Sequence, residues 1–239
     1  MTSDNSLKDT EPLLGIIGGM GTQATARFYE VLHNLQSVAS EQEYLDVLLY
    51  SKPSIPDRTA FITGKSSESP LDHLIRAAQV LDSAGASCIV IPCATSHFFY
   101  GELVKSVKIP VLNMLEETAR YAKACGIKHV CLLATDGTLS GAFFHKAFDK
   151  YSIDVTVPDK SMQSDLMDMI YDVKCGKEVT AAIFESMISK LRDDGAEAVV
   201  LGCTELCVIA GSTKQNPVII NTLEVLAEAA ILFFRDKSS

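Results

Sequence analysis

Hydrophobic residues follow two alternating patterns along the chain. Short runs rich in valine, isoleucine and leucine are typical of strands buried in parallel sheets, and between them apolar residues recur at helical spacing. The strand-like runs occupy residues 13–19, 44–51, 86–93, 109–114, 129–135, 153–158, 196–202 and 217–221. Helical spacing is clearest in residues 25–36, 70–85 and 181–195. This alternation predicts an α/β fold with parallel sheets flanked by helices.

The two halves of the chain resemble each other. The stretch AGASCIVIPCAT (84–95) aligns with DGAEAVVLGCTE (194–205) at a shift of 110 residues. Further on, PVLNMLEETA (110–119) is similar to PVIINTLEVLA (217–227). The period is too long for a solenoid and predicts two similar α/β domains. Ligands of such sheets bind beyond the carboxyl ends of the strands, and each half has a cysteine at such an end.

These two cysteines are Cys93 and Cys203. A pseudo-twofold relation between the domains would place them face to face across a cleft. The alternative is that both are packed core cysteines, which is common for a single cysteine. Each of them, however, precedes hydroxyl-bearing residues where a helix begins, and a helix N-terminus lowers the pKa of a cysteine. Two thiols in equivalent positions therefore indicate a catalytic role rather than core packing.

Composition narrows the function classes. The chain has 239 residues and a formal net charge of −9, so we expect no nucleic-acid partner, which would need a basic face. No apolar run approaches the roughly 18–20 residues of a membrane span, and the N-terminal residues are polar, unlike an export signal. Seven dispersed cysteines favour reduced thiols over disulfides and argue against zinc. We expect a cytoplasmic protein that can still bind a small anion through a few local cations.

Two opposed thiols suit proton transfer at carbon better than hydrolysis. A nucleophilic cysteine needs a histidine base, and although His97 follows Cys93 by four residues, the equivalent place in the second half is Cys207. In a two-base reaction, one thiolate removes a proton from a tetrahedral carbon while the opposite thiol protonates the other face. Such a reaction inverts configuration. The near-symmetry of the halves suits an enzyme that interchanges its acid and base between directions.

Successive motifs along nearly the whole chain resemble those of the aspartate/glutamate racemase superfamily, most closely its cofactor-independent aspartate racemases. In order they are GIIGGMGTQAT (15–25), PSIPDRTAFITGK (53–65), IPCATSHFF (91–99), IPVLNMLEETA (109–119), LLATDGT (132–138), IYDVKCGK (170–177) and LGCTE (201–205). The resemblance implies that Cys93 and Cys203 are the catalytic acid/base pair. It implies no pyridoxal phosphate, metal or nucleotide, and a free amino acid as the small-molecule substrate.

The resemblance also implies an architecture. It consists of two similar Rossmann-like domains with the active site in the cleft, the last helix returning to the first domain, and commonly a homodimer. We expect a flexible tail at residues 1–12, a first domain of 13–112 plus 223–239, and a second domain of 113–222.

Substrate-binding residues follow from the same resemblance. The family's binders of the side-chain carboxylate fall on Arg58 and Lys174, a fork and a point charge that suit a dianionic substrate. Without the resemblance, a surface turn arginine and a solvated helix lysine would be the simpler interpretation. Four threonines are candidate hydroxyl donors or helix caps: Thr95, Thr135, Thr138 and Thr204.

The glycine-rich segment after the first strand has two interpretations. Gly19, Gly21 and Ala24 satisfy a dinucleotide fingerprint, which would require an acidic residue about 20 positions on, at the end of the second strand. That strand ends in Ser51 and Lys52 instead. We therefore expect the backbone N–H groups around Met20 and Gly21 to approach a substrate carboxylate.

One position departs from the family pattern. The first cysteine is usually followed by an asparagine that resembles a substrate-binding group, and here Ala94 takes its place. Asn113 and Asn221 are not obvious replacements. We expect a racemase of aspartate, or of glutamate. The alternatives are a two-cysteine isomerase of the superfamily with another amino-acid substrate, and a non-catalytic two-domain ligand-binding protein.

Overall fold

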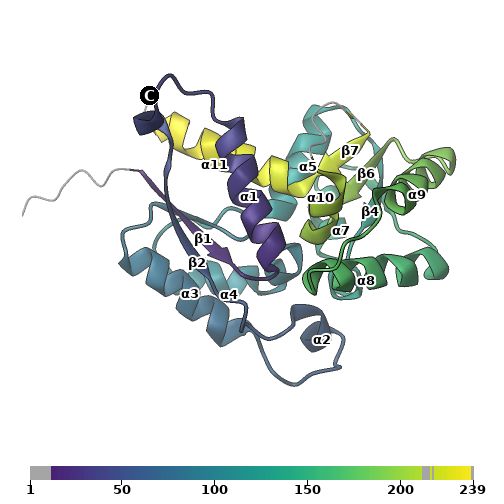
Figure 1. The fold of residues 1–239 in the computed structure, drawn as a ribbon, viewed down its shortest axis with the longest axis horizontal. Coiled ribbons are helices and arrows are strands. Elements are labelled where there is room, and N and C mark those ends of the chain that lie inside the picture. The colour runs from purple at the N-terminus through teal and green to yellow at the C-terminus, as the bar shows by residue number, and fades with distance from the viewer. Residues whose placement is uncertain (1–11, 212–215, 217, 238–239) are drawn as a thin grey trace, which may run out of the picture.

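Two parallel β-sheets flanked by helices form the computed structural model, which describes residues 12–211, 216 and 218–237 (Figure 1). In the first sheet, β1 (Leu13–Gly18) lies between β2 (Asp46–Ser51) and β3 (Cys88–Val90). The predicted α/β class is confirmed. The tail expected at residues 1–12 lies, apart from Pro12, outside the described residues.

The second sheet has four strands in the order β5-β4-β6-β7. They are β4 (His129–Leu133), β5 (Asp154–Thr156), β6 (Ala198–Leu201) and β7 (Ile219–Asn221), and every pairing is parallel. All four residues of β6 are buried, as the continuous apolar run of a central parallel strand requires.

The strand predicted at residues 109–114 is reduced to one isolated bridge between Val111 and Ile89. The physical reason is the start of the next helix: the Asn113 side chain accepts hydrogen bonds from the amides of Leu115 and Glu116. An asparagine cap satisfies helix donors that have no partner within the helix. It therefore ends the extended segment early.

Helices cover both faces of each sheet (Figure 1). The α-helices are α1 (Thr22–Leu35), α2 (Arg58–Ile62), α3 (Leu71–Ser83), α4 (Tyr100–Ser106), α5 (Met114–Ala124), α6 (Asp136–Ser140), α7 (Phe143–Asp149), α8 (Lys160–Lys174), α9 (Ala181–Asp193), α10 (Thr204–Ala210) and α11 (Thr222–Lys237). Two 3₁₀ helices, η1 (Glu41–Glu43) and η2 (Ala94–Phe99), complete the described elements. The last helix, α11, packs against α1 as well as α5 and so joins the two halves.

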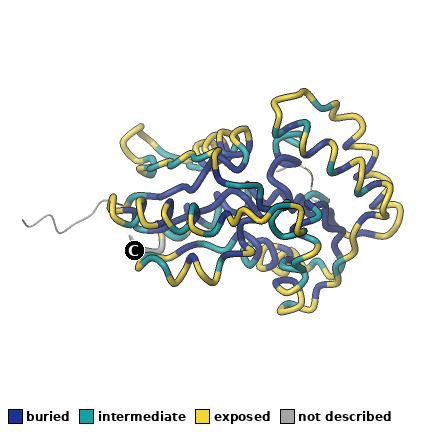
Figure 2. Tube along the Cα trace, turned by 90° about the horizontal axis from the view of Figure 1, so that it is seen from below, coloured by how far each residue is buried: buried dark blue, intermediate teal, exposed yellow. Residues whose placement is uncertain are grey.

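The core lies on both sides of β1. Ile16 belongs to a buried cluster with Phe28 of α1, whereas its neighbour Ile17 belongs to a second cluster with Leu74 and Leu81 of α3. Adjacent strand residues point to opposite faces, so one strand anchors both helical layers. Each of these buried side chains contributes about 1.5–3 kcal/mol of transfer free energy. Figure 2 shows buried positions along the interior strands and exposed ones along the outer helices.

The sequence repeat is visible as repeated local structure. The helices α3 and α9 both end two residues before a left-handed glycine, Gly85 with φ of 90° and Gly195 with φ of 102°. Glycine adopts this conformation without the steric cost that other residues meet. Each turn then leads into a buried strand, β3 or β6, and each strand leads to one of the two candidate cysteines.

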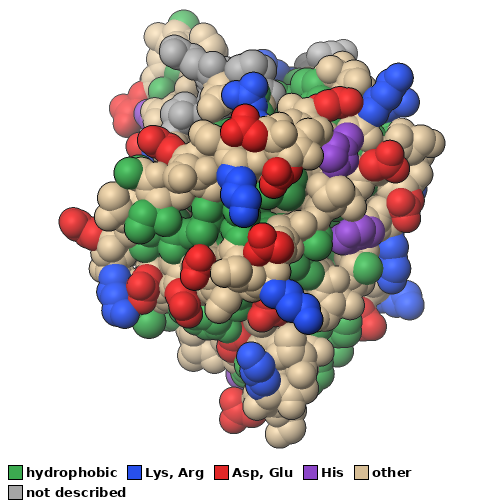
Figure 3. Space-filling view, turned by 90° about the vertical axis from the view of Figure 1, so that its right-hand side faces the viewer, with side chains coloured by type: hydrophobic (Ala, Val, Ile, Leu, Met, Phe, Trp, Pro, Cys, Tyr) green, Lys and Arg blue, Asp and Glu red, His purple; other side chains and the backbone are tan. Residues whose placement is uncertain are grey.

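Charge on the surface is mixed. On the face shown in Figure 3, lysine and arginine side chains are scattered among aspartate and glutamate around small groups of hydrophobic residues. No broad basic area, of the kind that nucleic-acid binding needs, is visible on that face. Among the residues that the structure describes, no helix is long and apolar enough to cross a membrane.

Candidate active site

Both candidate cysteines lie beyond the carboxyl ends of equivalent strands. Cys93 is the N-cap residue of η2 and Cys203 is the N-cap residue of α10. Their relative exposures are 6% and 4%, and all seven cysteines carry free thiols. The predicted placement at helix starts is confirmed, and the near-equal burial gives the two thiols similar access to solvent.

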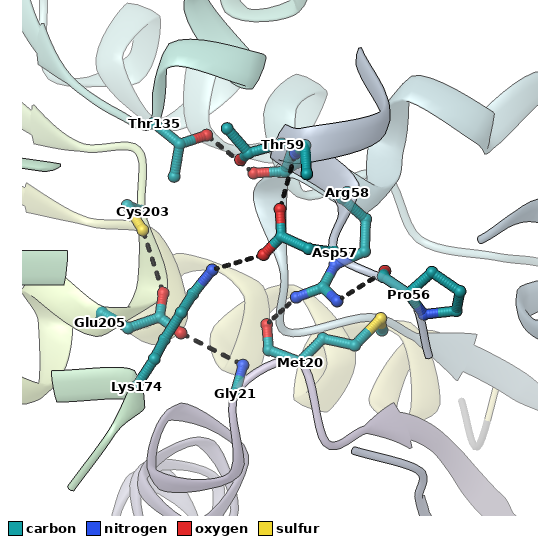
Figure 4. A network of polar contacts seen from close by, with 12 residues as sticks. Met20, Gly21, Pro56, Asp57, Arg58, Thr59, Thr135, Lys174, Cys203 and Glu205 are labelled. Carbon is teal, nitrogen blue, oxygen red and sulfur yellow. Dashed lines mark hydrogen bonds and ion pairs between the residues drawn. The ribbon is translucent and has the colours of Figure 1, made fainter. Parts of the chain in front are cut away.

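A carboxylate that sequence reasoning did not select sits beside Cys203. The Cys203 thiol donates to Glu205 Oε2 at 3.0 Å, and the Gly21 amide donates to Glu205 Oε1 at 3.1 Å (Figure 4). The Thr204 hydroxyl also donates to Oε2, at 3.4 Å. Glu205 is 2% exposed. The signal that could have identified it is the repeat, because Glu205 aligns with a neutral residue, Thr95.

The electrostatic surroundings of Cys203 correct one expectation. A helix N-terminus was expected to lower the pKa of each candidate thiol. Burial instead raises the Cys203 pKa well above its usual value, and the Glu205 carboxylate raises it further, against the opposing charge of Lys174. A helix terminus contributes only about 0.3–1 kcal/mol in most settings, whereas removing a charged form from water costs more. Cys203 is therefore held as the thiol.

A triangle of hydroxyl groups lies on the Cys93 side. Thr95 Oγ1 is 3.1 Å from Thr135 Oγ1 and 2.9 Å from Thr138 Oγ1, and the latter two are 3.1 Å apart. All three threonines are buried. Thr135 also caps α6 by accepting from the Thr138 amide. The structure thus brings three of the four predicted threonines together, and Thr204 lies at the other cysteine.

The turn at Met20 and Gly21 borders both cysteine segments. Ser96, in the helix that follows Cys93, donates its hydroxyl to the Met20 sulfur at 3.4 Å. The Gly21 amide, which we expected to face a substrate carboxylate, is already bonded to Glu205. Cys93 and Cys203 are therefore linked to one short segment of the first half.

The neighbouring glycines serve close packing. A Cβ atom at Gly19, where φ is 92°, would lie 2.6 Å from backbone atoms of Lys52 and Pro53. One at Gly18 would lie 2.4 Å from Thr25 Cγ2. The space in front of these glycines is filled by the chain itself, which disfavours the dinucleotide interpretation. Within residues 12–211, 216 and 218–237, no group of three or more His, Cys, Asp or Glu side chains could hold a metal ion.

Arg58 is buried, which excludes a surface turn arginine. It is 6% exposed and donates to the carbonyl oxygens of Ile55 at 3.2 Å, Pro56 at 3.0 Å and Met20 at 3.3 Å (Figure 4). Its Nε is buried with no hydrogen-bond partner. Arg58 therefore supports the Met20 turn and keeps one donor unused.

Lys174, the last residue of α8, points toward the same region. Its Nζ lies 3.8 Å from Asp57 Oδ2 and 5.1 Å from the centre of the Tyr171 ring. Burial alone would lower the Lys174 pKa, but the Glu205 carboxylate is among the negative groups that raise it above its usual value. Lys174 is thus a stable cation close to Arg58, Cys203 and Glu205.

His97 and Cys207 occupy equivalent positions and are both structural. His97 Nδ1 lies 3.1 Å from the Cys93 carbonyl oxygen, and Nε2 accepts from the Met114 amide at 3.1 Å. Burial lowers the His97 pKa to about 4, so the ring is neutral and committed to the backbone. Burial raises the Cys207 pKa to about 12. Neither residue can serve as a base for Cys93 in the manner of a hydrolase.

Neither Asn113 nor Asn221 replaces the amide missing at Ala94. Asn113 caps α5, and Asn221 likewise accepts from the amides of Leu223 and Glu224 at the start of α11. Both asparagines are committed to helix starts. A groove of about 710 Å³ lies at the opposite edge of the first sheet, where Pro12 and Asp46 meet Phe234. It contains none of the predicted site residues.

Comparisons with known proteins identify the family of the chain. A family model described as Asp/Glu/hydantoin racemase matches residues 17–230. The broad specificity amino-acid racemase RacX of Bacillus subtilis strain 168 is 24% identical over 231 residues, covering 92% of this chain and 96% of that protein. The structure of Picrophilus torridus aspartate racemase has a TM-score of 0.84 and 33% identity, covering 93% of this chain and 94% of that one. An aspartate racemase homologue from Pyrococcus horikoshii OT3 shares the fold, with a TM-score of 0.74 and 24% identity over 93% of this chain and 98% of that one. The protein belongs to the Asp/Glu/hydantoin racemase family.

Proposed function

We propose that the protein is an amino-acid racemase that interconverts L- and D-aspartate, with Cys93 and Cys203 as acid and base and without pyridoxal phosphate. The observation that carries the proposal is the pair of buried thiols at equivalent strand ends, both bordering the Met20–Gly21 turn. Membership of the racemase family supports the reaction class. The similarity to an aspartate racemase at 33% identity supports the substrate.

In the proposed reaction the substrate α-carbon lies between the two sulfurs. One cysteine, as the thiolate, accepts the α-proton, and the other donates its proton to the opposite face of the planar intermediate. The reverse reaction interchanges the two roles. Burial of both thiols supports this chemistry because a site closed to water strengthens electrostatic interactions and limits loss of the transferred proton.

The side-chain carboxylate of aspartate would bind Arg58 and Lys174. Arg58 Nε is a buried donor without a partner, and such a group gains most from a ligand that accepts its hydrogen bond. The ion pair between Lys174 Nζ and Asp57 Oδ2 is long, at 3.8 Å, which leaves room for a substrate carboxylate to bind closer to the ammonium group. Two converging cations give the site a reason to prefer a dicarboxylic amino acid.

A second candidate is a racemase of the same family that prefers another amino acid. Ala94 favours it, because the amide that resembles a substrate-binding group in the family is missing. Glutamate would use the same two cations with a longer side chain.

Turnover of single-enantiomer amino acids in heavy water would test the proposal. L-aspartate should lose its α-hydrogen as D-aspartate forms, with a chelator present and no added cofactor, as followed by chiral chromatography and mass spectrometry. The Cys93→Ser/Cys203→Ser double variant is the matched control and should show neither change. Absence of racemisation for every amino acid would favour a non-catalytic ligand-binding protein. A requirement for pyridoxal phosphate would overturn the two-thiol mechanism.

A further inference from the structure

The two candidate cysteines differ in the residue two positions further on. The repeat aligns Thr95 with Glu205 at the same shift of 110 residues that aligns Cys93 with Cys203. Thr95 is neutral and bonds to the hydroxyls of Thr135 and Thr138. Glu205 carries a carboxylate that reaches back to the Cys203 thiol. The local structure is repeated, but the charge beside the sulfur is not.

Glu205 is held in place by contacts from two halves of the molecule. Its Oε1 accepts from the Gly21 amide, 184 residues away in sequence, and its Oε2 accepts from Cys203 (Figure 4). A Cβ atom at Gly21 would lie 3.0 Å from Oε1, so the close approach of the amide depends on glycine. The carboxylate therefore has little freedom to leave the thiol.

The charged and titratable groups around this pair are few. Lys174 of α8 faces both Glu205 and Cys203, and Asp57, before α2, balances Lys174 from the other side. The positive charge of Arg58 acts to lower the Lys174 pKa. Cys207 lies one turn further along α10, and its thiol donates to the Cys203 carbonyl oxygen. Removing the proton from Cys203 would create a thiolate 3.0 Å from a buried carboxylate, and Lys174 is the cation that acts on this thiol.

We propose, building on the proposed racemase function, that Glu205 is a positioning residue that keeps the proton on Cys203, so that the substrate-free enzyme presents Cys203 as the acid and Cys93 as the base. In one direction the Cys93 thiolate accepts the substrate α-proton and Cys203 donates its own. The cycle leaves a Cys203 thiolate beside Glu205 and a proton on Cys93. Solvent then returns a proton to Cys203 and removes the one on Cys93.

This asymmetry has a kinetic consequence. The enantiomer whose α-hydrogen faces Cys93 binds the resting form, whereas the other enantiomer binds the minor form. The apparent affinity for this other enantiomer is reduced in proportion to the fraction of enzyme in the minor form. Since the two enantiomers have equal free energy, kcat/KM must be equal in both directions, so the enantiomer with the higher KM must also have a proportionally higher kcat. By the assignment that the family resemblance suggests, Cys93 serves the D-isomer, which should have the lower KM.

Thiol labelling over a range of pH tests the proposal directly. Iodoacetamide reacts with the thiolate, and mass spectrometry of the two cysteine peptides gives a separate rate for each sulfur. The near-equal burial of Cys93 and Cys203 makes the ratio of rates a measure of protonation. The variant is Glu205→Gln, which can still accept from the Gly21 amide, and the charge control is Glu185→Gln, exposed on α9.

In the wild type, Cys93 should label about tenfold or more faster than Cys203 at neutral pH, equivalent to about one unit of pKa. Glu205→Gln should accelerate Cys203 by a similar factor, leave Cys93 nearly unchanged and bring the two KM values together. Glu185→Gln should change neither. Equal labelling in the wild type, or a Glu205→Gln variant with unaltered Cys203 labelling, overturns the inference. If Glu205→Gln does not fold, the wild-type pH profile of Cys203 decides, because its labelling should then rise only at a pH above the usual range of a cysteine thiol.

The two proposals fail separately. A wild-type protein that racemises aspartate but labels both cysteines equally refutes the role of Glu205 alone. A protein with unequal labelling and no turnover or α-hydrogen exchange refutes the racemase function and, with it, the catalytic meaning of the asymmetry.

Discussion

Replacing Lys174 by methionine separates substrate binding from folding more cleanly than any other change in the site. The lysine, which also faces the buried Glu205 carboxylate, makes two direct contacts: a 3.8 Å ion pair with partly exposed Asp57 and a cation–π contact with Tyr171. Such an ion pair is worth about 0–1 kcal/mol, and the ring contact about 0.5–1 kcal/mol. Methionine keeps most of the aliphatic length. Lys174→Met should therefore lower the free energy of unfolding by no more than about 1–2 kcal/mol.

The expected effect on catalysis is larger. If Lys174 binds the side-chain carboxylate of aspartate, its loss removes a charged partner worth about 2–4 kcal/mol in a closed site. At about 1.4 kcal/mol per tenfold change, kcat/KM for aspartate should fall roughly 30-fold to several hundred-fold. Inhibition by succinate, which has two carboxylates and no α-ammonium, should weaken by a similar factor. Succinate binding needs no proton transfer, so it separates the role in binding from the influence of Lys174 on Cys203.

The assay is racemisation followed by chiral chromatography, with urea unfolding of the same samples. Lys177→Met is the matched control, because Lys177 lies just beyond α8, is 66% exposed and pairs with Asp172. It should leave turnover and succinate inhibition unchanged. Lys174→Met with wild-type aspartate turnover and wild-type succinate inhibition would refute the reasoning and make Lys174 a solvated helix-end lysine.

Three further predictions concern the thiols, Arg58 and His97. Cys93→Ser and Cys203→Ser should each abolish racemisation, while each retains α-hydrogen exchange with one enantiomer. Cys125→Ser, at an exposed cysteine, is the control. Near-wild-type turnover in either site variant would disprove the two-thiol mechanism. Arg58→Leu should lower kcat/KM for aspartate by roughly 30-fold or more. It should also lower the free energy of unfolding by on the order of 2–4 kcal/mol, because three backbone carbonyls lose a buried charged donor. Unchanged aspartate turnover would make Arg58 a purely structural residue. Burial lowers the His97 pKa from 6.5 to about 4, so between these pH values the unfolded state binds a proton that the folded state does not. Urea unfolding should therefore show the free energy of unfolding falling by up to about 3 kcal/mol as the pH drops through this window. His97→Gln should flatten that pH dependence, and an equally steep loss in the variant would contradict the assignment.

The sequence predicts the architecture well because the signals for it are local and periodic. Apolar runs of the right length mark β1, β4 and β6, and the aligned glycines Gly85 and Gly195 mark the turns that lead into the strands holding the cysteines. The strand near Val111 is weaker than predicted because the helix cap at Asn113, two residues away, competes with it. Local patterns describe each strand but not how far a neighbouring helix start shortens it.

Site chemistry is less predictable because it depends on contacts between distant segments. The bond between Gly21 and Glu205 joins residues 184 apart, and nothing in either motif specifies it. Arg58 has the sequence context of a turn arginine, yet its donors face carbonyl groups in the interior. The pKa of Cys203 moves against the helix-terminus expectation because burial and a neighbouring carboxylate outweigh it. Spacing places the reactive atoms, but their charge state is set by tertiary packing.

The contact between α2 and α6 bears on how this protein could be engineered. A Cβ atom at Gly137 would lie 2.8 Å from Thr59 Cα and 3.1 Å from its hydroxyl oxygen. The nearest atom is backbone, so no change of rotamer could accommodate a larger residue there. The close approach of these two helices consequently depends on glycine at position 137. A library intended to admit bulkier substrates would gain more from varying residue 137, where even one methyl group forces the helices apart, than from trimming side chains around the thiols.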